Sequence, residues 1–213
     1  MDRTSFAQSG QDVLADYILK SRRLIPFGDD YRGCFIDVGC CYPIRDSNTY
    51  FFYQRGWKGL CIDANPDAKA DFSEERPDDI FVNAAIGLES ESRPFYIFNN
   101  PQWNTFNAGR KEKKPESFKR EIVLSIDPLS KLIDRNLGES PRVDLLSIDT
   151  EGFEMQVLSS LDWARHRPKL VIVEIKRSIK EISNHKAVTF MESKNYSIVS
   201  HTGHDAMFVD DRL

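Results

Sequence analysis

Polar side chains follow several short apolar runs of the sequence, at the points where predicted strands end. In open α/β sheets a ligand binds beyond the carboxyl ends of the parallel strands, where the strand order reverses. The side chains at these ends are therefore the ones that could do chemistry. They are mostly carboxylates: Asp37, Asp63, Asn83, Asp149, Glu151 and Glu174.

Two of these carboxylates have the spacing of a ribose-binding unit. Asp63 follows Asp37 by 26 positions, close to the ~20-residue separation at which an acidic residue ends the second strand and accepts hydrogen bonds from a ribose diol. Either aspartate alone could be a turn or helix-capping residue. The pair at this spacing favours a ribose-bearing cofactor.

The glycine turn after Asp37 indicates which ribose-bearing cofactor the site would bind. A dinucleotide site needs the pattern GxGxxG, which lets pyrophosphate approach bare backbone at a helix N-terminus. Here only Gly39 is present, and residues 40–43 after it contain no further glycine. S-adenosylmethionine carries a ribose but no phosphate, and its sulfonium and ammonium groups suit a carboxylate-rich crevice. The turn therefore favours S-adenosylmethionine over a dinucleotide.

Asp149 and Glu151 are the predicted catalytic residues. They follow the apolar run 143–148, where an acceptor would approach. Either carboxylate could take the proton of an acceptor hydroxyl or help to hold a metal that acidifies it, although we predict no metal site. Glu151 could instead be a helix N-terminal acid that interacts with the helix dipole. His204, in a late turn, is an alternative base or substrate contact, but a turn histidine is usually solvated.

The predicted elements alternate along the chain, as expected for a doubly wound α/β sheet with helices on both faces. Apolar runs indicate strands, and apolar residues at helical spacing indicate helices. The last two strands are expected to close the sheet as an antiparallel pair at its edge. The predicted strands are 34–38, 60–62, 80–82, 94–98, 121–126, 143–148, 170–175, 196–199 and 206–209, and the predicted helices are 11–20, 47–54, 65–76, 128–137, 151–161 and 186–193.

Length and composition are those of an ordinary globular protein. The chain has 213 residues, of which 40% are hydrophobic and 29% are charged, so we expect one domain over residues 1–213. Within it, residues 1–32 form an N-terminal helical segment. Residues 99–120 are the least regular part and predict a lid or acceptor loop, or alternatively a solvated basic loop.

Charge and hydropathy argue against several classes of protein. The net charge of −4 disfavours a protein that wraps nucleic acid, because phosphate binding needs a basic face. No apolar run approaches the ~20 residues that span a bilayer, and the first residues lack the layout of a secretory signal. The four cysteines contain no CxxC pair and suggest neither a disulfide framework nor a zinc site. We therefore expect a cytoplasmic protein.

The sequence around these residues resembles the FkbM-type S-adenosylmethionine-dependent methyltransferases. The similarity spans nearly the whole chain, and the matching blocks follow one another in the family's order. One departure is Cys40-Cys41, where the family often has an alanine and an asparagine. The matching blocks are Ser9–Asp12, Phe35–Gly39 with Pro43 and Ser47–Thr49, Gly56–Trp57 with Gly59, Ile62–Pro66, Ala85–Gly87, and Ile148–Glu154 with Val157–Leu158.

The resemblance implies a Rossmann-like class I methyltransferase fold, with a seven-stranded, mostly parallel sheet and an antiparallel edge strand. It implies S-adenosylmethionine as the cofactor, and O-methylation of a sugar, glycan or related natural product. Gly39 would lie near the methionine part, Asp63 on the ribose, and residues 83–85 near the adenine. The cofactor-binding residues that it implies are Asp37, Gly39, Ser47, Asn48, Thr49, Asp63, Ala64, Asn83, Ala84, Ala85 and Asp149.

Other residues could contact the acceptor, which we expect to be a small molecule or a glycan. The resemblance implies that the segment before the first helix folds over the cofactor or acceptor, which involves Gln11 and Asp12. Trp103 beside Asn104 is an aromatic ring next to an amide that would suit stacking on a sugar, with a packed loop as the alternative. Together with His204, these are the predicted substrate residues.

Two other functions are compatible with the same strand-end carboxylates. An NAD(P)-dependent oxidoreductase of Rossmann type would also use the aspartate after the second strand, although the single glycine counts against it. A noncatalytic cofactor-binding module that regulates or scaffolds a biosynthetic complex would keep the cofactor site without the chemistry. The sequence indicates neither the identity of the acceptor nor the oligomeric state.

Overall fold

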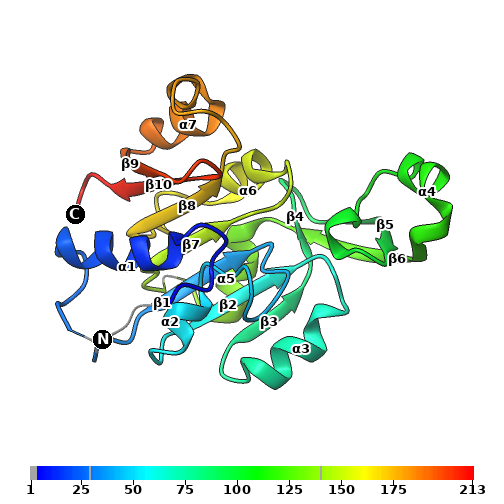
Figure 1. Cartoon of the computed structure of the whole chain (residues 1–213), viewed down its shortest axis with the longest axis horizontal. Helices are drawn as coiled ribbons and strands as arrows, with labels where there is room; N and C mark the ends of the chain where they lie inside the picture. The colour runs from blue at the N-terminus through cyan, green and yellow to red at the C-terminus, as the bar shows by residue number, and fades with distance from the viewer. Residues whose placement is uncertain (1–3, 29, 140) are drawn as a thin grey trace.

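Seven strands form the large sheet of the protein (Figure 1), in a computed structural model that describes residues 4–28, 30–139 and 141–213. The strand order is β3-β2-β1-β7-β8-β10-β9, and neighbours among the first five are parallel. The order reverses at β1, which lies between β2 and β7. The strands are β1 (Cys34–Val38), β2 (Lys58–Asp63), β3 (Ile80–Asn83), β7 (Leu145–Ile148), β8 (Leu170–Glu174), β9 (Tyr196–His201) and β10 (Asp205–Asp210).

The predicted seven-stranded, mostly parallel sheet is confirmed, but its antiparallel strand lies one position inside the edge. β10 pairs antiparallel with β8 on one side and with β9 on the other, so the edge strand β9 runs in the same direction as β8. Every residue of β10 is buried, whereas Ser197 and Ile198 of β9 are exposed. The strand that can be buried on both faces takes the inner position, and the more polar strand takes the edge.

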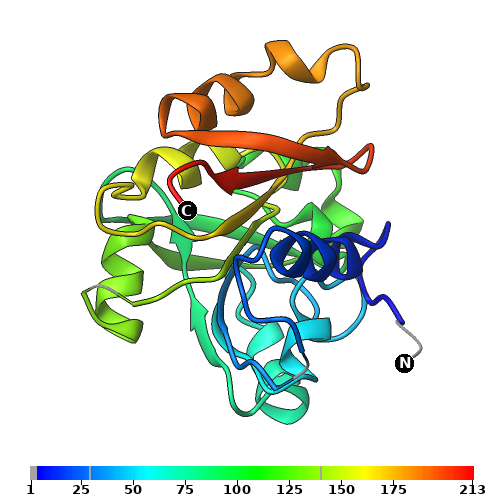
Figure 2. The ribbon, with the colours of Figure 1, turned by 90° about the vertical axis from the view of Figure 1, so that its left-hand side faces the viewer.

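Helices cover both faces of the large sheet, because successive side chains of each strand point to opposite faces. Ile36 and Leu60 pack against the helices of one face, and Phe35 and Cys61 pack against those of the other. Figure 2 shows α1 and α7 on opposite sides of the sheet. The first face carries α5 (Leu129–Leu137), α6 (Glu154–Ser160) and α7 (Lys186–Ser193), with the short η3 (Ile182–Asn184), and the second carries α1 (Gln11–Ser21), α2 (Tyr50–Tyr53) and α3 (Ala68–Glu75).

None of the helices in the described part of the chain is long and apolar enough to cross a membrane.

Three helices, α2, α3 and α6, begin three residues later than predicted, and the late starts of α2 and α6 shape the carboxyl edge of the sheet. α2 begins at Tyr50 rather than at residue 47, because the Ser47 hydroxyl accepts hydrogen bonds from the N–H groups of Thr49 (3.3 Å) and Tyr50 (3.1 Å) and closes a turn. α6 begins at residue 154 rather than at residue 151. Glu151 and Gly152 have positive φ angles of 51° and 106°, which an α-helix does not accommodate.

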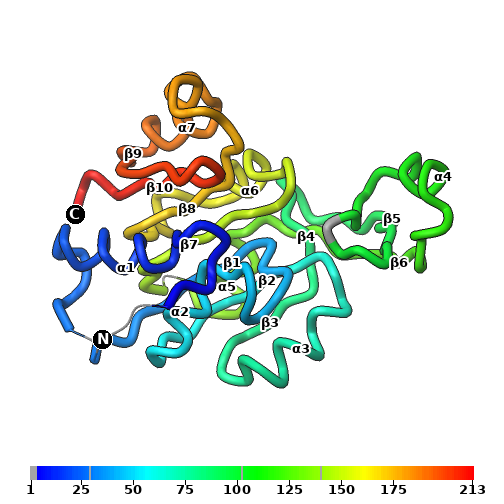
Figure 3. The backbone as a smooth tube through the Cα atoms, viewed as in Figure 1, coloured from blue at the N-terminus to red at the C-terminus, as the bar shows by residue number. Residues whose placement is uncertain are grey.

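A second, three-stranded sheet was not anticipated from the sequence. Its order is β4-β6-β5, with β5 and β6 antiparallel. These two strands and their connection, residues 91–127, form an arm that projects from the body of the molecule (Figures 1 and 3). The predicted irregular segment 99–120 is the tip of this arm. The elements are β4 (Ala85–Ile86), β5 (Glu91–Phe98), η1 (Pro101–Trp103), α4 (Gly109–Lys113), η2 (Pro115–Ser117) and β6 (Phe118–Asp127).

Candidate active site

A cavity of about 710 Å³ opens at the carboxyl ends of β1, β2, β3 and β7, where the strand order reverses and a ligand is expected. Ligand pockets measure about 300–1,000 Å³, so the cavity has room for a nucleoside cofactor. The body of the protein supplies one wall and the arm supplies the other. The predicted site residues that line it are Gly39, Asp63, Ala64, Ala84, Ala85, Asn104, Asp149 and Glu151.

Gly39 lets the ends of β1 and β7 approach each other. Its φ of +83° lies in the left-handed region, and a Cβ atom at this position would lie 1.7 Å from the carbonyl oxygen of Asp149. Only glycine has both the conformation and the space. The N–H group of Gly39 donates to the carbonyl oxygen of Ile62 at 2.8 Å. This one residue therefore joins the ends of three strands at the cavity.

Two backbone amides fix the carboxylate of Asp63. The N–H of Cys41 donates to Oδ2 at 2.8 Å, and the N–H of Asn65 donates to Oδ1 at 2.7 Å. Cys41 has a φ of 45°, which is uncommon for a residue other than glycine, and this turn brings its N–H to Asp63. Burial raises the pKa of Asp63, and the two hydrogen bonds oppose the rise. The turn at Cys40-Cys41 thus positions the predicted ribose-binding carboxylate.

Some predicted cofactor residues lie behind the cavity wall rather than in it. Asp37 is buried and accepts a hydrogen bond from the Thr49 hydroxyl at 2.6 Å. Burial raises the pKa of Asp37 to about 6. Asn83 donates through Nδ2 to the carbonyl oxygen of Asp63 at 2.9 Å. These side chains fix the strand ends from behind the cavity. The predicted cofactor-binding residues that do not line the cavity are Asp37, Ser47, Asn48, Thr49 and Asn83.

Arg76 holds this buried network together, and sequence reasoning did not single it out. Its side chain is fully buried, and Nε lies 2.7 Å from Asp79 Oδ2. Nη1 donates to the hydroxyls of Thr49 (3.1 Å) and Ser47 (3.4 Å). The arginine therefore ties the turn before α2 to the segment after α3. An arginine at the end of a predicted polar helix carries no local signal of this role.

We expect Arg76→Met to lower the free energy of unfolding by about 3–5 kcal/mol, because it leaves the buried Asp79 carboxylate without its counter-ion. Chemical denaturation measures the loss. The double variant Arg76→Met with Asp79→Asn should recover part of it, since no unpaired charge is then buried. Lys58→Met, which removes an exposed partner of Asp78, should cost no more than about 1 kcal/mol. Equal losses for Arg76→Met and Lys58→Met would contradict the assignment.

An acidic cluster lies at the ends of β7 and β8, and two of its three members, Asp149 and Glu151, line the cavity. Asp149, Glu151 and Glu174 bring carboxylate oxygens within 4.8 Å of one another. The Nζ atom of Lys176 lies 2.5 Å from Glu174 Oε1 and 3.1 Å from Glu151 Oε2. Lys176 therefore already supplies a positive charge at the place where these carboxylates could hold a divalent cation.

Asp149 is the member of the cluster that Lys176 does not pair with. Its Oδ1 atom is buried and has no hydrogen-bond partner among the described residues. Burial, together with the negative charges of Glu174 and Glu151, raises the pKa of Asp149 to about 8. A carboxylate with a raised pKa at the wall of a cavity is a stronger base than an exposed one.

Glu151 is held in the cluster by an unusual turn. Its left-handed φ of 51° is a conformation that persists in proteins only where surrounding contacts enforce it. Glu154 supplies these contacts, because its Oε1 atom accepts hydrogen bonds from the N–H groups of Gly152 (2.8 Å) and Thr150 (3.3 Å). The alternative role foreseen for Glu151, an acid at the helix N-terminus, belongs to Glu154, the first residue of α6.

The predicted substrate residues near the N-terminus are buried and do not line the cavity. Gln11 donates through Nε2 to Asp205 at 2.5 Å. Asp12 accepts hydrogen bonds from the backbone N–H of Phe6 (2.7 Å) and the hydroxyl of Ser5 (2.6 Å). Both side chains fix the segment before α1. It is Gln8 in that segment that reaches the cavity.

The other predicted substrate residues are dispersed over the molecule. Asn104 lines the cavity, and its side-chain oxygen accepts from the N–H of Phe98 at 2.8 Å. Trp103 does not line it; the Nζ atom of Lys114 lies 3.8 Å from the centre of its ring. His204 lines a separate, open hollow of about 760 Å³, next to Lys176.

Sequence reasoning missed the cavity residues that come from the arm and from the turn after Asp149. Phe95 lies in the predicted strand 94–98, and Arg93 precedes that range. Both belong to β5, in which residues two positions apart share a face. No local sequence pattern indicates that β5 lies along the cavity, because its position depends on its pairing with β6. The missed residues are Arg93, Phe95, Phe106, Arg110 and Phe153.

The sheet order, the glycine turn after β1 and the carboxylate after β2 define the fold as that of a class I, Rossmann-like methyltransferase. The chain belongs to the family of the methyltransferase FkbM domain, whose model matches residues 37–198. The predicted family is thus confirmed, with S-adenosylmethionine as its cofactor. Among curated proteins, none matches the chain.

Two solved structures are similar to the chain at low identity. One is the 1,6-didemethyltoxoflavin-N1-methyltransferase of Burkholderia thailandensis, with bound 1,6-didemethyltoxoflavin and S-adenosylhomocysteine; the identity is 9% and the TM-score 0.41, over 95% of this chain and 77% of that chain. The other is the precorrin-6y C5,15-methyltransferase of Geobacter metallireducens GS-15, at 10% identity and a TM-score of 0.46, over 98% of this chain and 91% of that chain.

The cavity residues fit S-adenosylmethionine. The turn at Gly39 has no space for a side chain and lacks the further glycines that a pyrophosphate needs. Asp63 and Glu151 line the cavity, and carboxylates suit the cationic sulfonium and ammonium groups of this cofactor. The orphaned Oδ1 atom of Asp149 also gives a ligand a hydrogen-bond acceptor that the protein itself does not use.

Proposed function

We propose that this chain is an O-methyltransferase that acts on a hydroxyl group of a sugar, a glycan or a related natural product. The observation that carries the proposal is the Asp149 carboxylate, which combines a buried, unpartnered oxygen with a raised pKa at the wall of the cofactor cavity. S-adenosylmethionine, when bound, supplies an electrophilic methyl group. The protein then has to hold the acceptor in line and remove its proton.

Several residues have separate proposed roles. Asp63 accepts hydrogen bonds from the ribose, as carboxylates at the end of the second strand do. The backbone at Gly39 contacts the methionine part, and Ala84 and Ala85 lie beside the adenine. Asp149 takes the hydroxyl proton, and alignment of the acceptor against the methyl group contributes up to roughly 7–11 kcal/mol.

Glu151 and Glu174 support Asp149 rather than compete with it. Lys176 pairs with both of them. Burial raises the pKa of Glu174, and Lys176 opposes this rise. Their negative charges then disfavour the ionised form of Asp149, which raises its affinity for a proton. The cluster thus places its most basic carboxylate at the cavity.

The proposal is tested by binding and by product analysis. We expect S-adenosylhomocysteine to bind the full chain in calorimetry, and we expect NAD not to bind. Incubation with S-adenosylmethionine and a panel of sugars, oligosaccharides and natural-product alcohols should give an O-methylated product in mass spectrometry. Binding of NAD instead of S-adenosylhomocysteine would favour an oxidoreductase. Cofactor binding with no methylated product from any hydroxyl compound would favour the noncatalytic module.

The pH dependence of the reaction should report Asp149. Only the ionised carboxylate accepts a proton, so kcat/KM, which reports the pKa values of the free enzyme, should rise about tenfold per pH unit below the pKa of about 8 and level off above it. Glu174→Gln removes one of the charges that raise this pKa, and it should move the midpoint to lower pH. Initial rates between pH 6 and pH 10 measure both profiles. A flat wild-type profile would show that proton transfer to Asp149 does not limit the reaction.

A further inference from the structure

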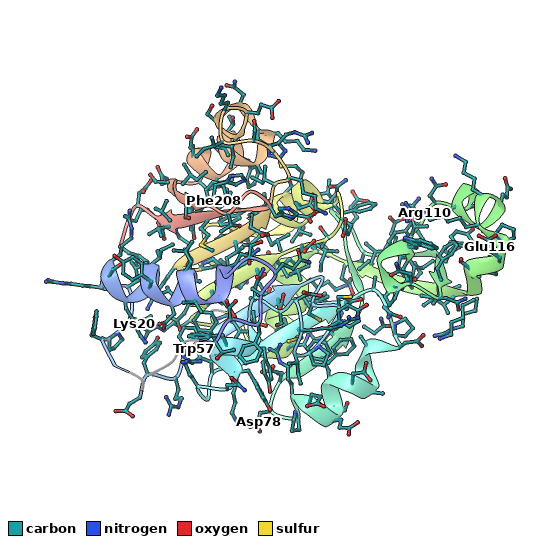
Figure 4. The ribbon with its side chains drawn as sticks, viewed as in Figure 1. Lys20, Trp57, Asp78, Arg110, Glu116 and Phe208 are labelled. Carbon is teal, nitrogen blue, oxygen red and sulfur yellow. The ribbon has the colours of Figure 1, made fainter. Side chains whose placement is uncertain are left out.

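The tip of the arm is the basic part of an otherwise acidic protein. Residues 99–120 contain six basic and two acidic residues, a net charge of +4, whereas the whole chain carries −4. Figure 4 shows Arg110 and Glu116 on the arm, well apart from Trp57 and Phe208 on the body. A basic segment of this kind attracts anions.

Several basic side chains of the tip are already partnered within the protein. Their partners are acidic side chains or an aromatic ring, so these cations mainly stabilise the arm itself. The contacts are Lys119 (2.8 Å) and Arg120 with Asp67, Lys111 with Glu121 (3.6 Å), and Lys114 with the ring of Trp103 (3.8 Å to its centre).

Arg110 differs from these residues because it is partly buried and lines the cavity. Its Nη1 atom donates to the backbone carbonyl oxygen of Trp103 at 3.0 Å. Within the described ranges of the chain, no carboxylate forms an ion pair with it. A guanidinium carries five N–H donors in a planar fork that matches a carboxylate or a phosphate. Arg110 therefore keeps donors for a ligand in the cavity.

An aromatic wall lines the same cavity as Arg110 and connects the arm to the body. The ring centre of Phe106 lies 4.8 Å from that of Phe95 and 6.4 Å from that of Phe153. Phe153 belongs to the turn that follows Asp149, so this contact joins the arm to the loop of the proposed base. Arg93 lies over the Phe106 ring at 5.7 Å. A molecule held on this wall is therefore next to the proposed site of proton transfer.

The cavity is electrostatically divided. Its body side carries Asp63 and Glu151, whose negative charges suit the cationic cofactor and repel an anion. Its arm side carries Arg93 and Arg110. Glu91 pairs with Arg93 at 4.0 Å, with both side chains about half exposed, and such a pair is weak. An anionic group in this cavity would therefore be held on the arm side, near Arg110.

We propose that the methyl acceptor carries an anionic group, a carboxylate or a phosphate, which binds at the tip of the arm with Arg110 as its anchor. The aromatic wall of Phe95, Phe106 and Phe153 contacts the part of the acceptor that bears the reacting hydroxyl. This inference rests on the proposed function and names the chemical class of its substrate.

The test measures binding of matched neutral and anionic probes, so it does not depend on finding the natural acceptor. The full chain, saturated with S-adenosylhomocysteine, is titrated calorimetrically with glucose, glucuronate and glucose 6-phosphate. We expect at least one of the two anions to bind about 10- to 100-fold more tightly than glucose, as a charge-assisted contact allows. Glucuronate and glucose 6-phosphate distinguish a carboxylate from a phosphate.

Two single-charge variants of α4 make the test specific. Arg110→Gln should abolish the preference for the anion, while Lys113→Gln should keep it, because Lys113 is exposed and does not line the cavity. Both variants should bind S-adenosylhomocysteine as the wild type does, which also shows that they are folded. The inference is overturned if no probe binds, if glucose binds as tightly as the anions, if both variants behave alike, or if Arg110→Gln weakens cofactor binding instead.

The proposed function and this inference fail in different ways. Absence of S-adenosylhomocysteine binding to the wild type contradicts methyl transfer. Normal binding of S-adenosylhomocysteine without a preference for anionic probes contradicts only the anion site.

Discussion

Asp149→Asn should lower kcat by about 10²–10⁴, the usual contribution of a positioned general base. Asparagine keeps the size of the side chain and its carbonyl oxygen, but it cannot take a proton from the acceptor hydroxyl. Because Asp63 and Gly39 are unchanged, the dissociation constant of S-adenosylhomocysteine should change much less than kcat. Initial rates with the acceptor from the product screen, together with calorimetry, measure the two effects separately.

A matched substitution controls for the loss of one negative charge. Asp78→Asn removes the same charge from an exposed site that pairs with Lys58 and does not line the cavity, so its kcat should match the wild type. If Asp149→Asn also retains wild-type kcat, Asp149 is not the base. If it instead loses cofactor binding in proportion to activity, its role lies in the cofactor site rather than in proton transfer.

The fold could largely be predicted from the sequence because its signals are local. The strands around Phe35 and Leu146 are nearly continuous apolar runs, as expected for parallel strands buried on both faces. The pairing of the last two strands is less local. Both β9 and β10 read as short strands, and only their burial in the assembled sheet shows that β10 takes the inner position.

The candidate site could be predicted where a strand end alone decides the position of a side chain. Asp63 is the last residue of β2 and Asp149 directly follows β7, and both line the cavity. Asp37 also lies close to the end of its predicted strand. In the structure it lies within β1 and points to the opposite face from Val38. Its carboxylate therefore accepts a hydrogen bond from Thr49 behind the cavity wall. Adjacent residues of a strand point to opposite faces, so a shift of one position turns this side chain away from the cavity.

The residues of the arm could not be placed from the sequence because their position depends on long-range pairing. Tyr96 and Glu121 are partners in the register of β5 and β6, 25 positions apart in the chain, and this pairing turns the segment into a projecting hairpin. Phe106 then reaches Phe153 of the body. No periodicity within residues 99–120 carries information about that contact.

Gly39→Ala should be the most damaging small substitution in the chain. The new methyl group would lie 1.7 Å from the carbonyl oxygen of Asp149, at a φ of +83°. The left-handed backbone alone costs about 1–2 kcal/mol for alanine, and forced separation of packed elements adds about 1–3 kcal/mol. We therefore expect the free energy of unfolding to fall by about 2–5 kcal/mol, with loss of S-adenosylhomocysteine binding.

Gly138→Ala separates the two contributions to that loss. Gly138 has a φ of +90° and a ψ of 171°, a backbone region that is almost restricted to glycine, and no heavy atom lies within 4 Å of the position that a Cβ atom would take there. This variant therefore has only the backbone cost and should keep the cofactor affinity of the wild type. Chemical denaturation and calorimetry on both variants measure the difference. The prediction is contradicted if the two variants lose similar stability and Gly39→Ala still binds S-adenosylhomocysteine. In that case β1 and β7 can move apart freely, and the cavity does not depend on their close approach.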